Sequence, residues 1–263
     1  MKISLFQQDI HWLDPTANWH KVEQVLIDHP DTDLLVLPEM CTTGFDTAPV
    51  IEQIETEQAT EHHLCQLARQ YGTAIVGSFA IRETSGNGMF NRCYFATPED
   101  GCIAHYDKKH LFSPGGEDRQ FESGNSQVVA EWRGIRFMLS VCYDLRFPVW
   151  LRNTEQLRYD ILVCVANWPD SRQLAWDTLI RARAIENQAY CIAVNRVGDD
   201  KTCHYVGGTS AIHPYGHAVA NCNDNEEGIC SFSPDMDKLI SYRTKFPSLQ
   251  DADAFALGVM NKE

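Results

Sequence analysis

The chain has 263 residues, of which 44% are hydrophobic and 22% charged, an ordinary globular composition that excludes a disordered or fibrous chain. Its formal net charge is −14, from 22 basic and 36 acidic residues, which argues against a nucleic-acid partner because phosphate binding needs a basic face. Such acidity also repels anionic small molecules at long range, so an anionic substrate would need local cations, for which Lys108 and Arg146 are the obvious candidates.

The amino-terminal segment and the cysteines indicate where the protein works. Residues 1–9 break their apolar run too early for a signal peptide, and no window of the sequence supplies a membrane span. The ten cysteines form no Cys-x-x-Cys pair, so free, mostly buried thiols are expected rather than disulfides. We therefore expect a cytoplasmic protein without a membrane partner, in which only local context can mark a functional cysteine.

Strand-like and helix-like segments alternate along the chain. Strands are predicted at 2–8, 33–38, 73–81, 91–97, 102–107, 126–132, 135–141, 160–165, 190–196, 204–213 and 217–222. Helices are predicted at 16–28, 57–71, 148–156, 172–189 and 235–243.

Turn sequences and apolar runs predict the fold class. Residues 97–101 and 213–216 have the turn chemistry that joins antiparallel strands, so the sheets are expected to be mixed. Continuous apolar strands such as 33–38 and 160–165 call for layers above and below them, as in an α/β fold. No linker or repeat interrupts the pattern, which predicts one domain over residues 1–263 with a carboxy-terminal tail from about residue 245.

One cysteine stands at an abrupt change from apolar to polar sequence. Residues 136–148 read Arg-Phe-Met-Leu-Ser-Val-Cys-Tyr-Asp-Leu-Arg-Phe-Pro, so a strand delivers Cys142 into a polar turn, and Pro148 suits the first turn of a following helix. Cations and helix amino-terminal amides near such a position favour the thiolate. Cys142 is therefore the candidate nucleophile.

Two charged residues occupy comparable positions. Glu39 ends the buried strand at 33–38, and Lys108 ends the strand at 102–107 within a basic cluster. Taken alone, Glu39 fits a structural ion pair as well as a functional carboxylate, and the basic cluster fits a solvated charge run. Together with Cys142 they lie at carboxyl ends of predicted strands, the edge where α/β sheets assemble their sites.

The three residue types form a chemical set for acyl transfer. A thiol with an ordinary pKa of roughly 8.5 is mostly protonated at neutral pH, so it needs a base, and a carboxylate can serve. A lysine ammonium can stabilise the oxyanion of a tetrahedral intermediate. This chemistry requires no histidine, no metal ion and no organic cofactor.

The sequence motifs around these three residues resemble those of the nitrilase superfamily of carbon–nitrogen hydrolases. The matching motifs, in order, are Leu37-Pro38-Glu39-Met40, Tyr106-Asp107-Lys108-Lys109-His110-Leu111-Phe112 and Val141-Cys142-Tyr143-Asp144-Leu145-Arg146-Phe147-Pro148, continued by Ala166-Asn167-Trp168-Pro169, residues 181–187 and residues 195–198. The resemblance implies a four-layer α-β-β-α sandwich with mixed sheets, commonly paired as a homodimer. It also implies a Glu39-Lys108-Cys142 triad, with the Tyr143 backbone N–H as a second oxyanion donor.

The cysteine motif is similar to that of the ω-amidase branch, whose members deaminate 2-oxoglutaramate and 2-oxosuccinamate. True nitrilases usually carry Trp-Glu or Gly-Glu after the cysteine, so nitrile hydrolysis is disfavoured. Val149 stands where many relatives of this branch have glutamate, which leaves the subgroup open. A small amide substrate with an α-keto acid end is expected.

The resemblance further implies a second glutamate that positions the lysine. Glu117 is the best match and Glu122 the alternative. Four residues are candidates for contacting the substrate: Phe45, Arg146, Asn167 and Trp168.

Other interpretations of the sequence remain open. An N-carbamoyl amidohydrolase or a nitrilase could use the same triad, and a catalytically silent binding or scaffold protein could keep the same fold. His62, His63 and Cys65 lie on one predicted helix, but a polar helix surface explains them better than a zinc site does. The pair Cys203-His204 is equally weak evidence for a zinc site.

Overall fold

The computed structural model describes residues 1–48, 54–84, 86 and 88–257. Its helices are α1 (Pro15–Asp28), α2 (Glu57–Tyr71), α3 (Gln173–Glu186) and α4 (Met236–Lys245), with short 3₁₀-helices η2 (Ser113–Gly115), η3 (Glu117–Arg119), η4 (Cys142–Arg146) and η5 (Asp170–Arg172). Its strands are β1 (Ile3–Gln7), β2 (Leu34–Val36), β3 (Glu55–Thr56), β4 (Ala74–Arg82), β5 (Met89–Thr97), β6 (Gly101–Asp107), β7 (Val129–Trp132), β8 (Ile135–Val141), β9 (Ile161–Ala166), β10 (Tyr190–Asn195), β11 (Val197–Asp199), β12 (His204–Val206), β13 (Ser210–Ile212), β14 (Ala218–Asn221) and β15 (Gly228–Phe232).

All but two of the strands form two large mixed sheets, and β11 and β12 pair separately. The first has the order β15-β1-β2-β4-β5-β6, with β3 added beside β4, and the second has the order β14-β13-β10-β9-β8-β7. The strands β1, β2 and β4 run parallel, as do β8, β9 and β10, and β3 is parallel to β4, while the remaining pairs of both sheets are antiparallel. The turns at 97–101 and 213–216 join β5 to β6 and β13 to β14 as predicted.

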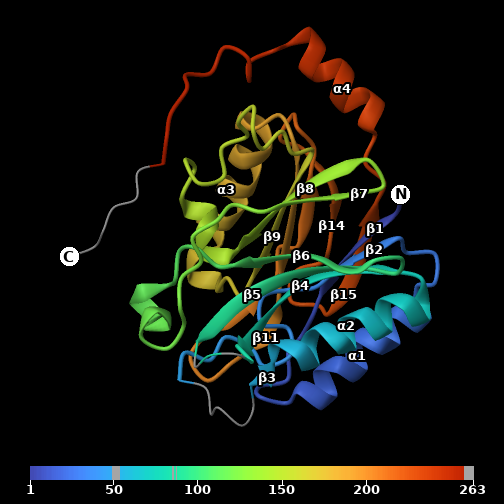
Figure 1. Cartoon of the computed structure of the whole chain (residues 1–263), viewed down its shortest axis with the longest axis vertical. Coiled ribbons are helices and arrows are strands. Elements are labelled where there is room, and N and C mark those ends of the chain that lie inside the picture. The colour runs from blue at the N-terminus through green and yellow to red at the C-terminus, as the bar shows by residue number, and fades with distance from the viewer. Residues whose placement is uncertain (49–53, 85, 87, 258–263) are drawn as a thin grey trace.

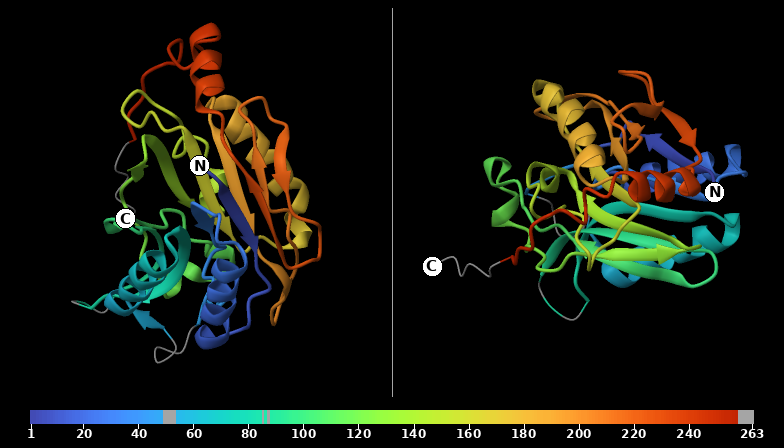
Figure 2. Two further views of the ribbon diagram at one scale, coloured as in Figure 1. Left: turned by 90° about the vertical axis from the view of Figure 1, so that its right-hand side faces the viewer. Right: turned by 90° about the horizontal axis from the view of Figure 1, so that it is seen from above.

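Helices cover the outer faces of both sheets. In Figures 1 and 2, α1 and α2 lie together on one side and α3 on the other, with the two sheets between them. A large apolar core fills the space between the sheets, and a second core lies between the first sheet and the helices α1 and α2. The predicted four-layer α-β-β-α sandwich is therefore confirmed.

Local sequence explains why the first two helices form where they do. The Asp14 side chain accepts the Ala17 N–H at the start of α1, and Pro15 occupies the first turn, where its missing N–H costs nothing. The helix α2 begins at Thr56, whose side chain accepts the Ala59 N–H, and ends at Gly72 with φ +67°.

The helix predicted at 148–156 is wrong. The Phe147 carbonyl accepts N–H groups from Trp150 and Leu151, but the Asn153 N–H donates to Asn187 Oδ1 at 2.8 Å instead of continuing a helix. The Asn153 amide also donates to the carbonyls of Tyr159 and Asn187. Tertiary hydrogen bonds have therefore replaced helical ones, so Pro148 begins no α-helix.

Further differences concern strands, and the short strands β3 and β11 were not predicted. The predicted strand 204–213 is divided into β12 and β13 because Gly207 and Gly208 adopt positive φ of +92° and +80°. The strand β15 was missed, although its Ile-Cys-Ser-Phe run follows a polar turn, because its antiparallel partner β1 lies more than two hundred residues away in the chain.

The chain beyond α4 contains no helix or strand up to residue 257 (Figure 1). This segment is the described part of the predicted tail, and residues 258–263 lie outside the described residues. No helix among the described residues has the length and apolar character needed to cross a bilayer.

Candidate active site

Three strand ends bring the predicted catalytic residues together. Glu39 follows β2, Lys108 follows β6 and Cys142 follows β8, so both sheets contribute to one edge. The Lys108 ammonium lies 2.7 Å from Glu39 Oε1, and both side chains are completely buried. Within the first sheet β2 and β6 run in the same direction, which brings Glu39 and Lys108 to one edge, and Cys142 reaches the same cavity from the second sheet.

A second carboxylate completes the buried ion cluster. Glu117, in η3, holds the same ammonium at 2.8 Å through Oε2 and at 3.0 Å through Oε1. The Phe112 N–H donates to Glu117 Oε2, which ties the carboxylate to the loop after Lys108. Burial opposes the charge on Lys108, yet Glu117 and Glu39 together raise the pKa of its ammonium above the ordinary value, so it stays cationic.

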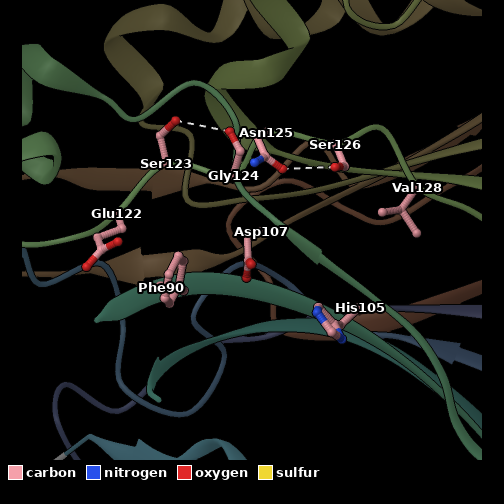
Figure 3. A pocket seen from close by; sticks show the side chains of 9 residues that line it. All are labelled: Phe90, His105, Asp107, Glu122, Ser123, Gly124, Asn125, Ser126 and Val128. Carbon is pink, nitrogen blue, oxygen red and sulfur yellow. Dashed lines mark hydrogen bonds between the residues drawn. The ribbon is translucent and has the colours of Figure 1, made fainter. Parts of the chain in front are cut away.

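Glu122, the alternative second glutamate, lies elsewhere. It is exposed and lines a separate hollow of about 440 Å³, together with Phe90, His105, Asp107 and residues 123–126 and 128 (Figure 3). Asp107 there is neutralised by Arg92 at 2.6 Å. Glu117 and not Glu122 is therefore the glutamate that contacts Lys108.

Cys142 has an unusual backbone and a buried thiol. Its φ is +46°, a left-handed value that is uncommon for a non-glycine residue. Its sulfur lies 3.8 Å from the Asn167 carbonyl oxygen. Burial, and next the nearby Glu39 carboxylate, raise the pKa of the Cys142 thiol well above its usual range, and Lys108 only partly opposes them. The thiol is therefore protonated at neutral pH and needs a base.

A buried aspartate holds the cysteine turn in this conformation. Asp144 Oδ2 accepts the Val141 N–H at 3.0 Å and the Tyr106 hydroxyl at 2.8 Å. Its other oxygen, Oδ1, accepts the His110 N–H at 3.0 Å. Asp144 thereby joins the Cys142 turn to the loop that carries Lys108.

A cavity of about 420 Å³ opens in front of the thiol. Its walls include all four residues predicted to contact the substrate, together with Lys108, Cys142 and Tyr143: Phe45, Arg146, Asn167 and Trp168. The Tyr143 ring packs edge-on against Phe112 at 5.1 Å. Asn167 also donates its backbone N–H to Glu39 Oε2 at 2.8 Å and its side-chain amide to the Glu39 carbonyl, which connects the cavity wall to the ion cluster.

The cavity presents two arginines. Arg146 lies over the Trp168 ring at 4.6 Å, and Arg172, which the sequence had not singled out, lies over the Phe112 ring at 5.1 Å. Within the described residues neither guanidinium forms an ion pair. Lys108, expected to serve as a cation for an anionic substrate, is instead occupied by its two glutamates. Arg172 is therefore a second cationic side chain, beside Arg146, on the cavity wall.

One acidic residue also lines the cavity, at the β11–β12 connection. Burial opposes the charge on Asp200, but hydrogen bonds from the Tyr205 hydroxyl and from the Thr202 and Cys203 N–H groups outweigh it and lower the pKa of this carboxyl. An anionic group entering the cavity would therefore be drawn to the arginines and repelled at Asp200.

Sequence reasoning also missed the polar residues behind the ion cluster. Asn91, in β5, donates its side-chain amide to Glu39 Oε1 at 2.8 Å and to Glu117 Oε1 at 2.9 Å. A signal was present, because the period of two along a strand places Asn91 on the same face as the core residues Cys93 and Phe95. A buried amide on such a face needs polar partners.

The other residues considered as candidates from the sequence form no metal site among the residues described. No group of three or more histidine, cysteine or acidic side chains there could hold a metal ion. His63 stacks on Trp19 at 4.2 Å, which gives it a packing role. Val149 is 53% exposed and does not line the cavity, so the departure from the branch motif leaves the site untouched. All ten cysteines are free.

Comparison with known proteins places the chain in a family. The carbon–nitrogen hydrolase family model matches residues 2–244. The chain is 40% identical to omega-amidase YafV of Escherichia coli (strain K12), over 98% of each chain. It is 33% identical to 2-oxoglutaramate amidase of Bacillus subtilis (strain 168), over 95% of this chain and 96% of that protein.

A solved structure supports the same assignment. The chain superimposes on XC1258 from Xanthomonas campestris, a CN-hydrolase superfamily protein with an arsenic adduct in its active site, with a TM-score of 0.92. The two are 37% identical, and the match covers 98% of this chain and 99% of the other. From its sequence, its sandwich fold and these similarities, we conclude that the chain belongs to the carbon–nitrogen hydrolase family.

Proposed function

We propose that the protein is an ω-amidase that releases ammonia from the terminal amide of small α-keto acids such as 2-oxoglutaramate and 2-oxosuccinamate. The observation that carries the proposal is a protonated thiol beside a buried carboxylate–ammonium cluster, in a cavity that offers two arginines without carboxylate partners among the described residues. The similarity to omega-amidase YafV and to 2-oxoglutaramate amidase over nearly the whole chain supports it.

The first half of the reaction forms a thioester. Glu39 accepts the Cys142 proton while the sulfur attacks the amide carbonyl carbon, and the carbonyl π electrons move to oxygen. Lys108 and the Tyr143 backbone N–H stabilise this oxyanion. The Lys108 ammonium suits the role because Glu39 and Glu117 fix its position while it still lines the cavity. Glu39 then protonates the nitrogen, the C–N bond breaks and ammonia leaves.

The second half releases the acid. Water loses a proton to Glu39 as its oxygen attacks the thioester carbonyl, and the C–S bond breaks when the intermediate collapses. The thiolate recovers the proton from Glu39. Glu117 positions Lys108 through both steps, consistent with its two short contacts to the ammonium.

The substrate's carboxylate end is proposed to bind the arginines. An oxo acid amide is anionic in a chain of net charge −14, so it requires local cations, and charge-assisted hydrogen bonds to guanidinium groups are strong. Arg146 and Arg172 both line the cavity. Phe45, Asn167 and Trp168 would complete the wall around the carbon chain.

Measuring ammonia release from a panel of amides tests the substrate class. We expect 2-oxoglutaramate to be turned over fastest, ahead of glutamine, N-carbamoyl amino acids and simple nitriles. Faster turnover of a carbamoyl compound or a nitrile would replace the ω-amidase assignment by one of those activities. No turnover of any of them, with Cys142 no more reactive toward iodoacetamide than the other thiols, would favour a silent scaffold.

We also propose that the protein forms a homodimer and that residues 1–263 form one domain with a tail from about residue 245. We further propose that it acts in the cytoplasm, without nucleic-acid or membrane partners. Exposed apolar side chains on neighbouring elements support the dimer, since Tyr215 and Tyr242 pack together and Ile240 and Phe246 are 60% and 59% exposed. The ten free cysteines support a reducing compartment. Sedimentation of the purified chain and of Ile240→Glu tests the dimer, which the variant is expected to weaken.

A further inference from the structure

Asn91 contacts every member of the buried ion cluster without reaching the substrate cavity. Its side-chain amide donates to Glu39 Oε1 at 2.8 Å and to Glu117 Oε1 at 2.9 Å, and its backbone carbonyl accepts the Lys108 backbone N–H at 3.0 Å. The side chain is completely buried and is not among the cavity walls. Such a residue can act on catalysis only through the groups that it holds.

The orientation of this amide is fixed by a second hydrogen-bond chain. The Met40 N–H donates to Ser78 Oγ at 3.0 Å, so the Ser78 hydroxyl hydrogen is free to point to Asn91 Oδ1, 2.9 Å away. Reversing the amide would direct Oδ1 at two carboxylates. Both hydrogens of Asn91 Nδ2 are therefore committed to Glu39 and Glu117.

We propose that Asn91 is a positioning residue that restricts the proton taken from Cys142 to one oxygen of Glu39, namely Oε2. This inference rests on the proposed function, in which Glu39 is the base. Oε1 already accepts two hydrogen bonds, from the Lys108 ammonium at 2.7 Å and from Asn91. Oε2 accepts only the Asn167 N–H, at 2.8 Å, among the contacts of the described residues.

The consequence for the reaction follows from the lone pairs of a carboxylate. Each oxygen offers about two acceptor positions, so Oε1 is full and Oε2 has one left. The S–H bond of Cys142 breaks, its electron pair remains on sulfur for the attack, and a new O–H bond forms at Oε2. The same O–H later protonates the departing nitrogen. Asn91 thereby prevents the proton from being held at Oε1, behind the cluster and away from the reacting atoms.

Replacing Asn91 by aspartate tests this role with little change in volume. The carboxylate removes one or both donors and adds negative charge beside Glu39, so the base retains its proton to higher pH. We expect kcat for 2-oxoglutaramate to fall by about tenfold to a hundredfold, as for loss of a hydrogen bond to a charged group. We also expect KM to stay within about twofold, since Asn91 does not line the cavity, and the acidic limb of the pH–rate profile to move to higher pH.

Two further variants separate positioning from folding. Asn153→Asp alters another buried asparagine, whose amide bonds the carbonyls of Tyr159 and Asn187, and it should lower the melting temperature while leaving kcat and the acidic limb unchanged. Ser78→Ala leaves Asn91 in place but removes the bond that orients it, together with the acceptor of the Met40 N–H. It should move the acidic limb in the same direction and lower kcat by about twofold to tenfold, which keeps the test available if Asn91→Asp does not fold.

The pH dependence of Cys142 alkylation by iodoacetamide gives a readout that needs no amide substrate. In Asn91→Asp and in Ser78→Ala, alkylation should require a higher pH than in the unaltered enzyme. Unchanged alkylation and an unchanged acidic limb in both variants would overturn the role of Asn91. Failure of the proposed function would look different, because the unaltered enzyme would then release no ammonia from 2-oxoglutaramate, or Cys142→Ala would retain that activity.

Discussion

Removing the charge of Arg172 should lower kcat/KM much more for anionic substrates than for neutral ones. Arg172 lines the cavity, lies over the Phe112 ring and forms no ion pair within the described residues, so its guanidinium is available to a carboxylate. A hydrogen bond between charged groups is worth about 1.5–3 kcal/mol, and each 1.36 kcal/mol corresponds to a factor of about ten. We therefore expect Arg172→Met to lower kcat/KM for 2-oxoglutaramate by about tenfold to 150-fold, mainly through KM.

The assay compares 2-oxoglutaramate with butyramide, a neutral amide, under steady-state conditions. Butyramide has no carboxylate to lose, so its kcat/KM should change by less than about threefold. Arg119→Met serves as the matched control, because Arg119 is exposed, outside the cavity wall and changes the net charge equally. Equal losses for both substrates, or a similar loss in Arg119→Met, would refute a direct contact between Arg172 and the substrate carboxylate.

Three other substitutions test the site. Cys142→Ala should abolish ammonia release and leave the far-ultraviolet circular dichroism spectrum unchanged. Glu117→Gln removes one of the two carboxylates that keep the buried Lys108 ammonium charged and in place, so it should lower both kcat and the melting temperature at about pH 7, whereas Glu122→Gln should change neither. Asp144→Asn loses acceptors for the Val141 N–H and the Tyr106 hydroxyl, so it should lower the melting temperature and the rate of Cys142 alkylation together.

The strand ends that form the site could be predicted from the sequence because the apolar run of a strand and the polar residue that ends it are both local features. Strand-like runs end at Glu39, Lys108 and Cys142, and β2 and β6 run in the same direction within the first sheet, while β8 ends at the same cavity from the second sheet. The pairing of Glu39 with Lys108 is then a consequence of the topology. What remained undecided was the choice between Glu117 and Glu122, since both follow Lys108 in a loop whose path depends on contacts such as the Phe112 N–H to Glu117.

Apart from the strand divided at Gly207 and Gly208, the errors share one physical cause, which is the effect of partners that are distant in the sequence. A helix after Pro148 is locally reasonable, but Asn187 offers hydrogen bonds to Asn153 from another part of the chain. The strand β15 is short and gains its ladder only from β1. Arg172 enters the cavity because η5 leads into α3 beside the second sheet, and no motif near it indicates this.

The two motifs that follow Lys108 and Cys142 are physically one unit. Cys142 holds a left-handed φ of +46°, which costs of order 1–3 kcal/mol for a residue with a Cβ. Asp144 stabilises the turn by accepting the Val141 N–H on one oxygen, and the other oxygen accepts the His110 N–H. The aspartate of the cysteine motif thus fixes both Cys142 and the loop of the lysine motif. Hydrogen bonds that offset the backbone strain at Cys142 therefore also fix the position of Lys108, so disturbing either motif should displace both side chains.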